Sequence, residues 1–457
     1  MSVLERISLP EFGGLEEDCP VIPIEEYQDR LGKITDAMPQ EKLDFLAVYA
    51  DREHSANICF LTGFDPRFEE ALLLLDRKGH RLLLVGNECI GYLPDRALGI
   101  EAELYQDFSL MGQPRESSRP LRAILTSFGI GRGSRIGCIG WKYFDSPATI
   151  ELPAFLVDLL RELTEEPQNL WNACGLLTDP GRGLRVSNTA SQLAQFEYAA
   201  VRCSESVLAA IRNLRPGVRE RDLEPFLQPG GLPLSMHNVV SFGEEQVRKG
   251  FASPGSRKAV LGDPFVISLG IWGSLSARAG VIAGGPADLA PELAGFYPEF
   301  AANYFDVVAA WYEALDIGAE AGAVFAAAEA RRNDRLFRFA LNTGHLTHLD
   351  EWLHSPFSHG STIPLRSGMA IQADIIPLSN GPYCYSNAED GLALADEKLR
   401  SQIASGYPRC WERIGARRNF MAEALHIRLA DCVLPLSNTP AWLPPYALSA
   451  DRVLIAS

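Results

Sequence analysis

The chain changes character at a short stretch rich in helix and strand breakers, residues 178–183 (TDPGRG). With 457 residues it is long enough for two or three domains, and such a stretch is a natural boundary between them. Before it, apolar runs such as 43–49 (LDFLAVY) alternate with amphipathic segments, which is typical of an α/β domain. Beyond it, a long helix is expected at 188–214, followed by strand-like runs around an alanine-rich helical block at 291–339. The pattern predicts two domains, residues 1–180 and 185–457.

Charge and cysteine content narrow the classes of function. A formal net charge of -16 argues against nonspecific nucleic-acid binding, which needs a basic surface. The nine cysteines are scattered without a C-x-x-C pair, as is typical of reduced thiols in the cytosol. The N-terminal segment MSVLERISLPEFGG lacks the apolar core of a signal peptide, and no run reaches the length of a membrane span. We therefore expect a soluble, cytoplasmic protein without nucleic-acid or membrane partners.

Three segments of the first half resemble the N-terminal domain of the creatinase and prolidase family. They are residues 43–46 (LDFL), 57–64 (NICFLTGF) and the hairpin 71–85. The resemblance implies a ribonuclease H-like N-terminal domain. In this family that domain reaches the cleft of the partner subunit, so the resemblance also implies a homodimer. Arg67 is then a candidate clamp for a substrate carboxylate across the dimer, the alternative being a solvated surface arginine.

The second half resembles the pita-bread domain of creatinase and aminopeptidase P. The matching segments follow the family's order: residues 187–203, 214–217 (LRPG), 262–270 (GDPFVISLG), 344–356 (GHLTHLDEWLHSP), 368–374 (GMAIQAD) and 388–390 (AED). The resemblance implies an α/β (α+β) chain that ends in a pita-bread (creatinase/aminopeptidase) domain.

Enzymes of this family hold two divalent cations with two Asp, one His and two Glu. Matched by position, the resemblance places the histidine at His345, the last glutamate at Glu389 and Asp374 where the other glutamate is expected. Ser268 stands at the first aspartate position, and residues 276–279 (SARA) contain no carboxylate. Because a hydroxyl brings no charge to offset two dications, we expect no dinuclear site. A single divalent metal such as Mn or Zn on His345, Asp374 and Glu389 remains an alternative.

Arg278 lies where the second aspartate is missing. If its side chain points inward, the permanent charge of the guanidinium could neutralise Asp374 and Glu389 without a metal. We expect this orientation, and the alternative is that Arg278 points to solvent.

Four of the eight histidines lie within residues 345–359 (HLTHLDEWLHSPFSH). His345 and His354 match motif positions, and an imidazole can move protons near neutral pH. Creatinases resemble this arrangement, because they are metal-free and grip a guanidinium with acidic residues. The histidine that they use is missing from residues 248–251 (RKGF), so His345 or His354 would have to replace it.

The sequence therefore predicts a diverged, metal-independent hydrolase without a cofactor, acting on a C–N bond of a small polar substrate. Guanidino, amidino and N-acyl amino acid compounds fit this description. The predicted catalytic residues are His345, His354, Asp374 and Glu389, and the predicted substrate-binding residues are Arg278, Arg67, Ser268 and Trp352. Two alternatives remain: a pseudoenzyme that binds a peptide or metabolite in the inherited cleft, and a mononuclear metallo-aminopeptidase.

Overall fold

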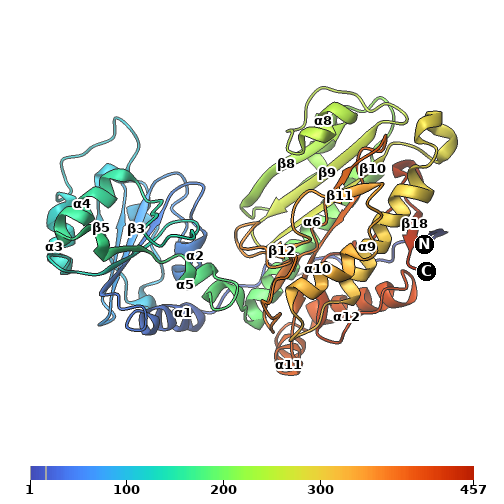
Figure 1. The fold of residues 1–457 in the computed structure, drawn as a ribbon. Coiled ribbons are helices and arrows are strands. Elements are labelled where there is room, and N and C mark those ends of the chain that lie inside the picture. The colour runs from blue at the N-terminus through green and yellow to red at the C-terminus, as the bar shows by residue number, and fades with distance from the viewer. Residues whose placement is uncertain (1, 16–17) are drawn as a thin grey trace. The chain divides into compact units, whose positions relative to one another are not determined.

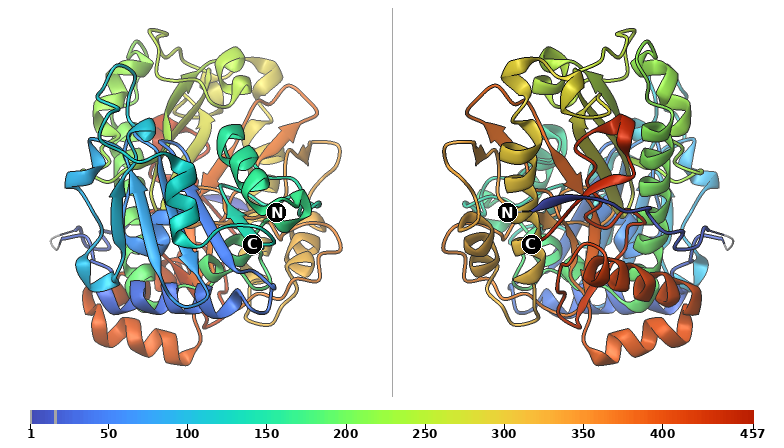
Figure 2. Two further views of the ribbon diagram at one scale, coloured as in Figure 1. Left: turned by 90° about the vertical axis from the view of Figure 1, so that its left-hand side faces the viewer. Right: turned by 90° about the vertical axis from the view of Figure 1, so that its right-hand side faces the viewer.

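The computed structural model describes residues 2–15 and 18–457, and the chain divides into two compact units. One unit is Ile22–Val186, and the other is Ser187–Ser457 together with the segment before Ile22. The predicted boundary at 180–185 lies close to this junction. The start of the predicted first domain, residue 1, is wrong, because β1 (Val3–Arg6) pairs with β18 (Arg452–Ile455) in the C-terminal unit (Figure 2).

The N-terminal unit is a six-stranded mixed sheet covered by helices on both faces. The strand order is β5 (Glu101–Leu104), β4 (Arg81–Val85), β3 (Ala71–Asp76), β2 (Phe45–Ala50), β6 (Ile136–Ile139) and β7 (Leu170–Asn172). Apart from Asp76 at the end of β3, the central strands β2 and β3 are apolar because both faces of the sheet are buried. Leu73 packs with α1 (Ile24–Ala37) and α2 (Ala56–Thr62), whereas its neighbour Leu72 packs with α3 (Leu121–Phe128) and α4 (Ala154–Thr164).

The C-terminal unit is built on two four-stranded sheets (Figure 1). The first has the order β15 (Asn387–Glu389), β10 (Ser274–Val281), β9 (Pro264–Ile271) and β8 (Leu234–Phe242). The second has the order β12 (His345–Leu346), β13 (Ala370–Gln372), β16 (Gly391–Leu394) and β17 (Val433–Pro435). Only Asp390 separates β15 from β16, so the chain passes from one sheet to the other beside Glu389.

Helices of the C-terminal unit pack around these sheets. They are α6 (Ala190–Arg212), α9 (Ala302–Glu313), α10 (Ala321–Glu329), α11 (Glu397–Gly406) and α12 (Pro408–Glu423), with the short α7 (Glu220–Leu223) and α8 (Glu244–Lys249). The long helix predicted at 188–214 is α6, which Thr189 caps by accepting a hydrogen bond from the Gln192 backbone. In the described chain, no helix combines the length and the apolar character that a bilayer span requires.

Candidate functional site

The hairpin of β9 and β10 forms one wall of the site. Its two-residue turn is Trp272-Gly273. Gly273 has a φ of +98°, and a Cβ there would lie 2.4 Å from the ring of Phe196, so both the backbone and the space require glycine. The turn places Ser268 opposite Ala277, and Ala277 in turn opposite Glu389 on β15. Since side chains alternate along a strand, the three residues share one face of the sheet.

A cavity of about 570 Å³ lies on this face. Its polar lining includes Ser268, Glu351, Asp374 and Glu389. The rest is mostly apolar and includes Met236, Val239, Phe251, Val266, Leu275 and Ile376. The cavity therefore has an acidic end and an apolar body.

A second, smaller hairpin brings His345 and Glu351 together. Backbone hydrogen bonds join Leu346 to Leu353 and His354, so the chain turns back immediately after β12. The fully buried His345 has its Nε2 atom 3.0 Å from a carboxylate oxygen of Glu351. On the cavity side, the ring of Trp352 stacks on the imidazole. Glu351 thus connects the buried histidine with the cavity.

Burial shifts the acids of this site toward their protonated forms. Burial raises the pKa of Asp374 to about 7, with the nearby His345 opposing and Glu351 adding to the shift. Burial, followed by the charges of Asp374 and Glu351, raises the pKa of Glu389 well above its ordinary value. Within the described residues, Asp374 Oδ1 is buried without a hydrogen-bond partner. Because negative charges close together and away from water are unfavourable, the three carboxylates should either bind protons or bind a cation.

Donor atoms of three residues lie close enough together to hold one metal ion. Ligand atoms of His345, Glu351 and Glu389 lie within 4.8 Å of one another, and imidazole with carboxylates is a donor set that suits Zn²⁺ or Mn²⁺. Glu351 takes the place that the sequence had assigned to Asp374 in a single-ion set. The hairpin adds no carboxylate to this set, because Ser268 and Ala277 occupy its positions that face the cavity.

Arg278 follows neither predicted orientation. It is buried on the opposite face of β10, where its Nη2 donates to both carboxylate oxygens of Asp390 at 2.8 and 2.9 Å. Its Nε donates to the carbonyl of Trp442 at 2.7 Å. Strand alternation explains the error, because Ala277 faces the cavity and the next residue must face away. Arg278 therefore neutralises Asp390, and its predicted role in substrate binding is wrong.

The other predicted residues are spread over several places. Ser268 and Trp352 line the cavity, and Trp352 is a wall, not part of the core, since 38% of it is exposed. His354 lies on the return strand of the small hairpin, outside the cavity lining. Arg67, in the N-terminal unit, is exposed and lies 3.4 Å from Asp65 and over the ring of Tyr92.

Glu351 is the site residue that the sequence interpretation missed. Glu351 lies between His345 and His354, in the segment that the sequence analysis singled out for its histidines alone. A carboxylate within that histidine-rich segment was the available signal.

The chain is similar to solved structures of peptidases. The prolidase from Pyrococcus horikoshii OT3 is 16% identical, with a TM-score of 0.61 over 80% of this chain and 95% of that chain. The Xaa-Pro dipeptidase from Bacillus anthracis is 15% identical, with a TM-score of 0.62 over 81% of this chain and 96% of that chain. The X-Pro aminopeptidase from Thermotoga maritima MSB8 is 12% identical, with a TM-score of 0.58 over 80% and 95%. No family model and no curated protein sequence matches the chain. The likeness confirms the predicted architecture: the chain has the pita-bread fold of prolidases and aminopeptidase P, together with their N-terminal domain.

Proposed function

We propose that the protein is a hydrolase that cleaves a C–N bond of a small organic cation, such as an amidine or a guanidine with an apolar body. The observation that carries this proposal is the meeting of Glu351, Asp374 and Glu389 at one end of an otherwise apolar cavity. Among the described residues, Arg248 is the one cationic side chain that lines the cavity, and it donates to Glu244 at 2.8 Å. A cationic ligand would neutralise carboxylates whose burial is otherwise unfavourable.

The proposed chemistry needs a proton acceptor and a proton donor. Water adds to the carbon of the C–N bond, the bond breaks, and the departing nitrogen takes a proton. Asp374, with a pKa of about 7, can accept the proton of the attacking water near neutral pH. Glu351 touches the cavity and His345 lies behind it at 3.0 Å, so the histidine acts through the glutamate as a positioning and proton-holding residue.

A second candidate function is hydrolysis assisted by one divalent ion. It is favoured by the close approach of donor atoms from His345, Glu351 and Glu389. When bound, such an ion would polarise the substrate and lower the pKa of a water molecule. In this case Asp374, outside the ligand set, keeps the role of proton acceptor.

One experiment separates the two candidates. Protein purified without chelator is analysed for Mn, Fe, Co and Zn, and then incubated with guanidino, amidino and N-acyl amino acids and Xaa-Pro dipeptides, with products read by mass spectrometry. Turnover that survives chelation and is lost in Glu389→Gln supports the first candidate. Turnover that requires about one ion per chain and is lost in His345→Ala supports the second. Ligand binding without turnover would contradict both and indicate a pseudoenzyme, and Glu245→Gln, an exposed substitution on α8, is the matched control.

The partner and the compartment also remain proposals. We propose a homodimer in the cytoplasm, with Arg67 contributing to the cleft of the other subunit. Light scattering of the purified protein tests the dimer. A loss of substrate affinity in Arg67→Gln without a change of mass would support the role of that residue.

A further inference from the structure

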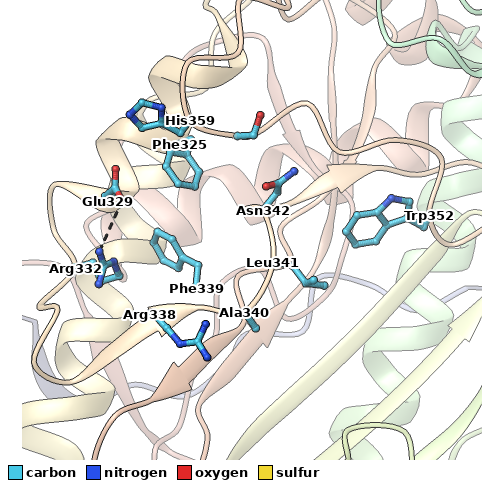
Figure 3. A pocket seen from close by; sticks show the side chains of 11 residues that line it. Phe325, Glu329, Arg332, Arg338, Phe339, Ala340, Leu341, Asn342, Trp352 and His359 are labelled. Carbon is cyan, nitrogen blue, oxygen red and sulfur yellow. Dashed lines mark ion pairs between the residues drawn. The ribbon is translucent and has the colours of Figure 1, made fainter. Parts of the chain in front are cut away.

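A second cavity, of about 660 Å³, adjoins the acidic one, because Ala340, Leu341 and Trp352 line both. Its remaining lining comes from α10 and the turn after it, from β11 (Phe337–Phe339) and from the loop around His359 (Figure 3). It therefore lies in the C-terminal unit alone.

The second cavity is basic where the first is acidic. Arg332 and Arg338 line it against a single carboxylate, that of Glu329. Arg332 is held in place, since its Nη1 donates to the Phe337 carbonyl at 2.8 Å and its Nη2 lies 3.7 Å from Glu329. That ion pair accounts for Glu329. The Arg338 side chain has neither a hydrogen bond nor an ion pair within residues 2–15 and 18–457. An arginine without a counterion in a chain of net charge -16 marks a local excess of positive charge.

Aromatic rings line the same cavity. Phe325 meets Phe339 edge-on with ring centroids 5.7 Å apart, and the ring of His359 lies 6.4 Å from Phe325. Figure 3 shows the two phenylalanine rings next to each other, with Trp352 across the hollow from them. Such rings favour edge-to-face contact with a further ring. A planar guanidinium favours a carboxylate, which it can bind through two parallel hydrogen bonds.

We propose that the second cavity binds an aromatic carboxylate. The ligand ring packs among Phe325, Phe339 and Trp352, and its carboxylate pairs with Arg338. This binding requires no chemistry in the acidic cavity, so the inference stands apart from the proposed hydrolase.

Calorimetric titration of the full chain with phenylacetate tests the proposal, and phenylacetamide serves as the neutral isostere. We expect phenylacetate to bind at least about tenfold more tightly than the amide, since a charge-assisted pair is lost in the amide. Binding should weaken when salt rises from about 50 to about 500 mM, because Arg338 is exposed.

Variants then locate the site. Arg338→Gln should weaken phenylacetate binding about tenfold, whereas Arg335→Gln, an exposed arginine that does not line the cavity, should leave it unchanged. Glu389→Gln should also leave it unchanged, which separates this inference from the proposed function. The proposal is overturned by equal affinity for acid and amide, by wild-type affinity in Arg338→Gln, or by no binding up to about 10 mM. Circular dichroism of each variant confirms that it is folded.

Discussion

The indole ring of Trp352 stacks on the imidazole of His345, with ring centroids 4.2 Å apart and an angle of 20° between the planes. The imidazole is buried, and the indole covers it on the side of the cavity. Glu351, next to Trp352 in the chain, lies 3.0 Å from the same imidazole. Two consecutive residues thus supply an apolar cover and a negative charge to one histidine.

The charge of Glu351 should control the protonation of His345. Burial works against a charged imidazole, but Glu351 beside it holds the pKa of His345 above its ordinary value. In metal-free protein, Glu351→Gln should therefore lower the pKa of His345. NMR titration of labelled histidine rings measures this change. Asp51→Asn, which removes the carboxylate 3.0 Å from His54, is the control and should leave His345 unaffected. An unchanged His345 would contradict the prediction.

Asp374 should make the protein less stable as the pH rises. The pKa of its buried carboxyl is about 7 in the folded chain, against 3.8 in an unfolded one, so the folded state binds the proton more tightly. This stabilisation is complete below the unfolded pKa and is lost between about pH 4 and pH 7, by up to about 4 kcal/mol. In Asp374→Asn, the free energy of unfolding measured with urea should change less between about pH 4 and pH 7. The exposed control Asp334→Asn should retain the slope, and a steeper slope in Asp374→Asn would contradict the assignment.

Replacing only one partner of the Arg278–Asp390 ion pair should strongly destabilise the protein. Both side chains are 1% exposed, and removing one partner leaves a buried charge alone. We expect Arg278→Met to lower the free energy of unfolding by about 3–5 kcal/mol, and the double variant with Asp390→Leu to recover part of the loss. Chemical denaturation measures both. Lys249→Met, which breaks an exposed pair on α8, should have little effect. Additive losses in the double variant would show that the pair is not the cause.

Gly344 should tolerate no side chain, because it precedes His345 with a φ of +94° in a crowded place. A Cβ there would lie 2.8 Å from Trp311 and 2.9 Å from the Gln372 carbonyl. Gly344→Ala should lower the free energy of unfolding by about 1–3 kcal/mol and displace His345. Gly360→Ala has a similar φ of +71° but open space, so it should lose only about 1 kcal/mol, and equal losses would argue against crowding.

The fold could be predicted because several motifs keep their order and spacing over most of the chain. Matching by motif position also predicted that Ser268, Asp374 and Glu389 belong to one site, and all three line the same cavity. Motif position does not depend on details of the turns, which is why these residues were found.

Side-chain direction could not be predicted without the register of a hairpin. The Trp272-Gly273 turn decides that Ala277 faces the cavity and Arg278 faces Asp390. If Trp272 and Gly273 had been taken as the two residues of a hairpin turn, alternation along the strand would have indicated which residues of β10 face the cavity. The position of Glu351 depends on how the chain folds back after Leu346, where backbone hydrogen bonds join Leu346 to Leu353 and His354, and this pairing cannot be read from a single sequence.

The pairing of β1 with β18 has a consequence for how the protein is made. β1 is synthesised before the N-terminal unit, and β18 only after the rest of the C-terminal unit. The N-terminal unit is continuous in the chain and can fold while translation proceeds. The C-terminal unit cannot complete the pair of β1 and β18 until β18 has left the ribosome. Contacts so distant along the chain are slow to form, so β1 stays an unpaired strand edge until β18 is available.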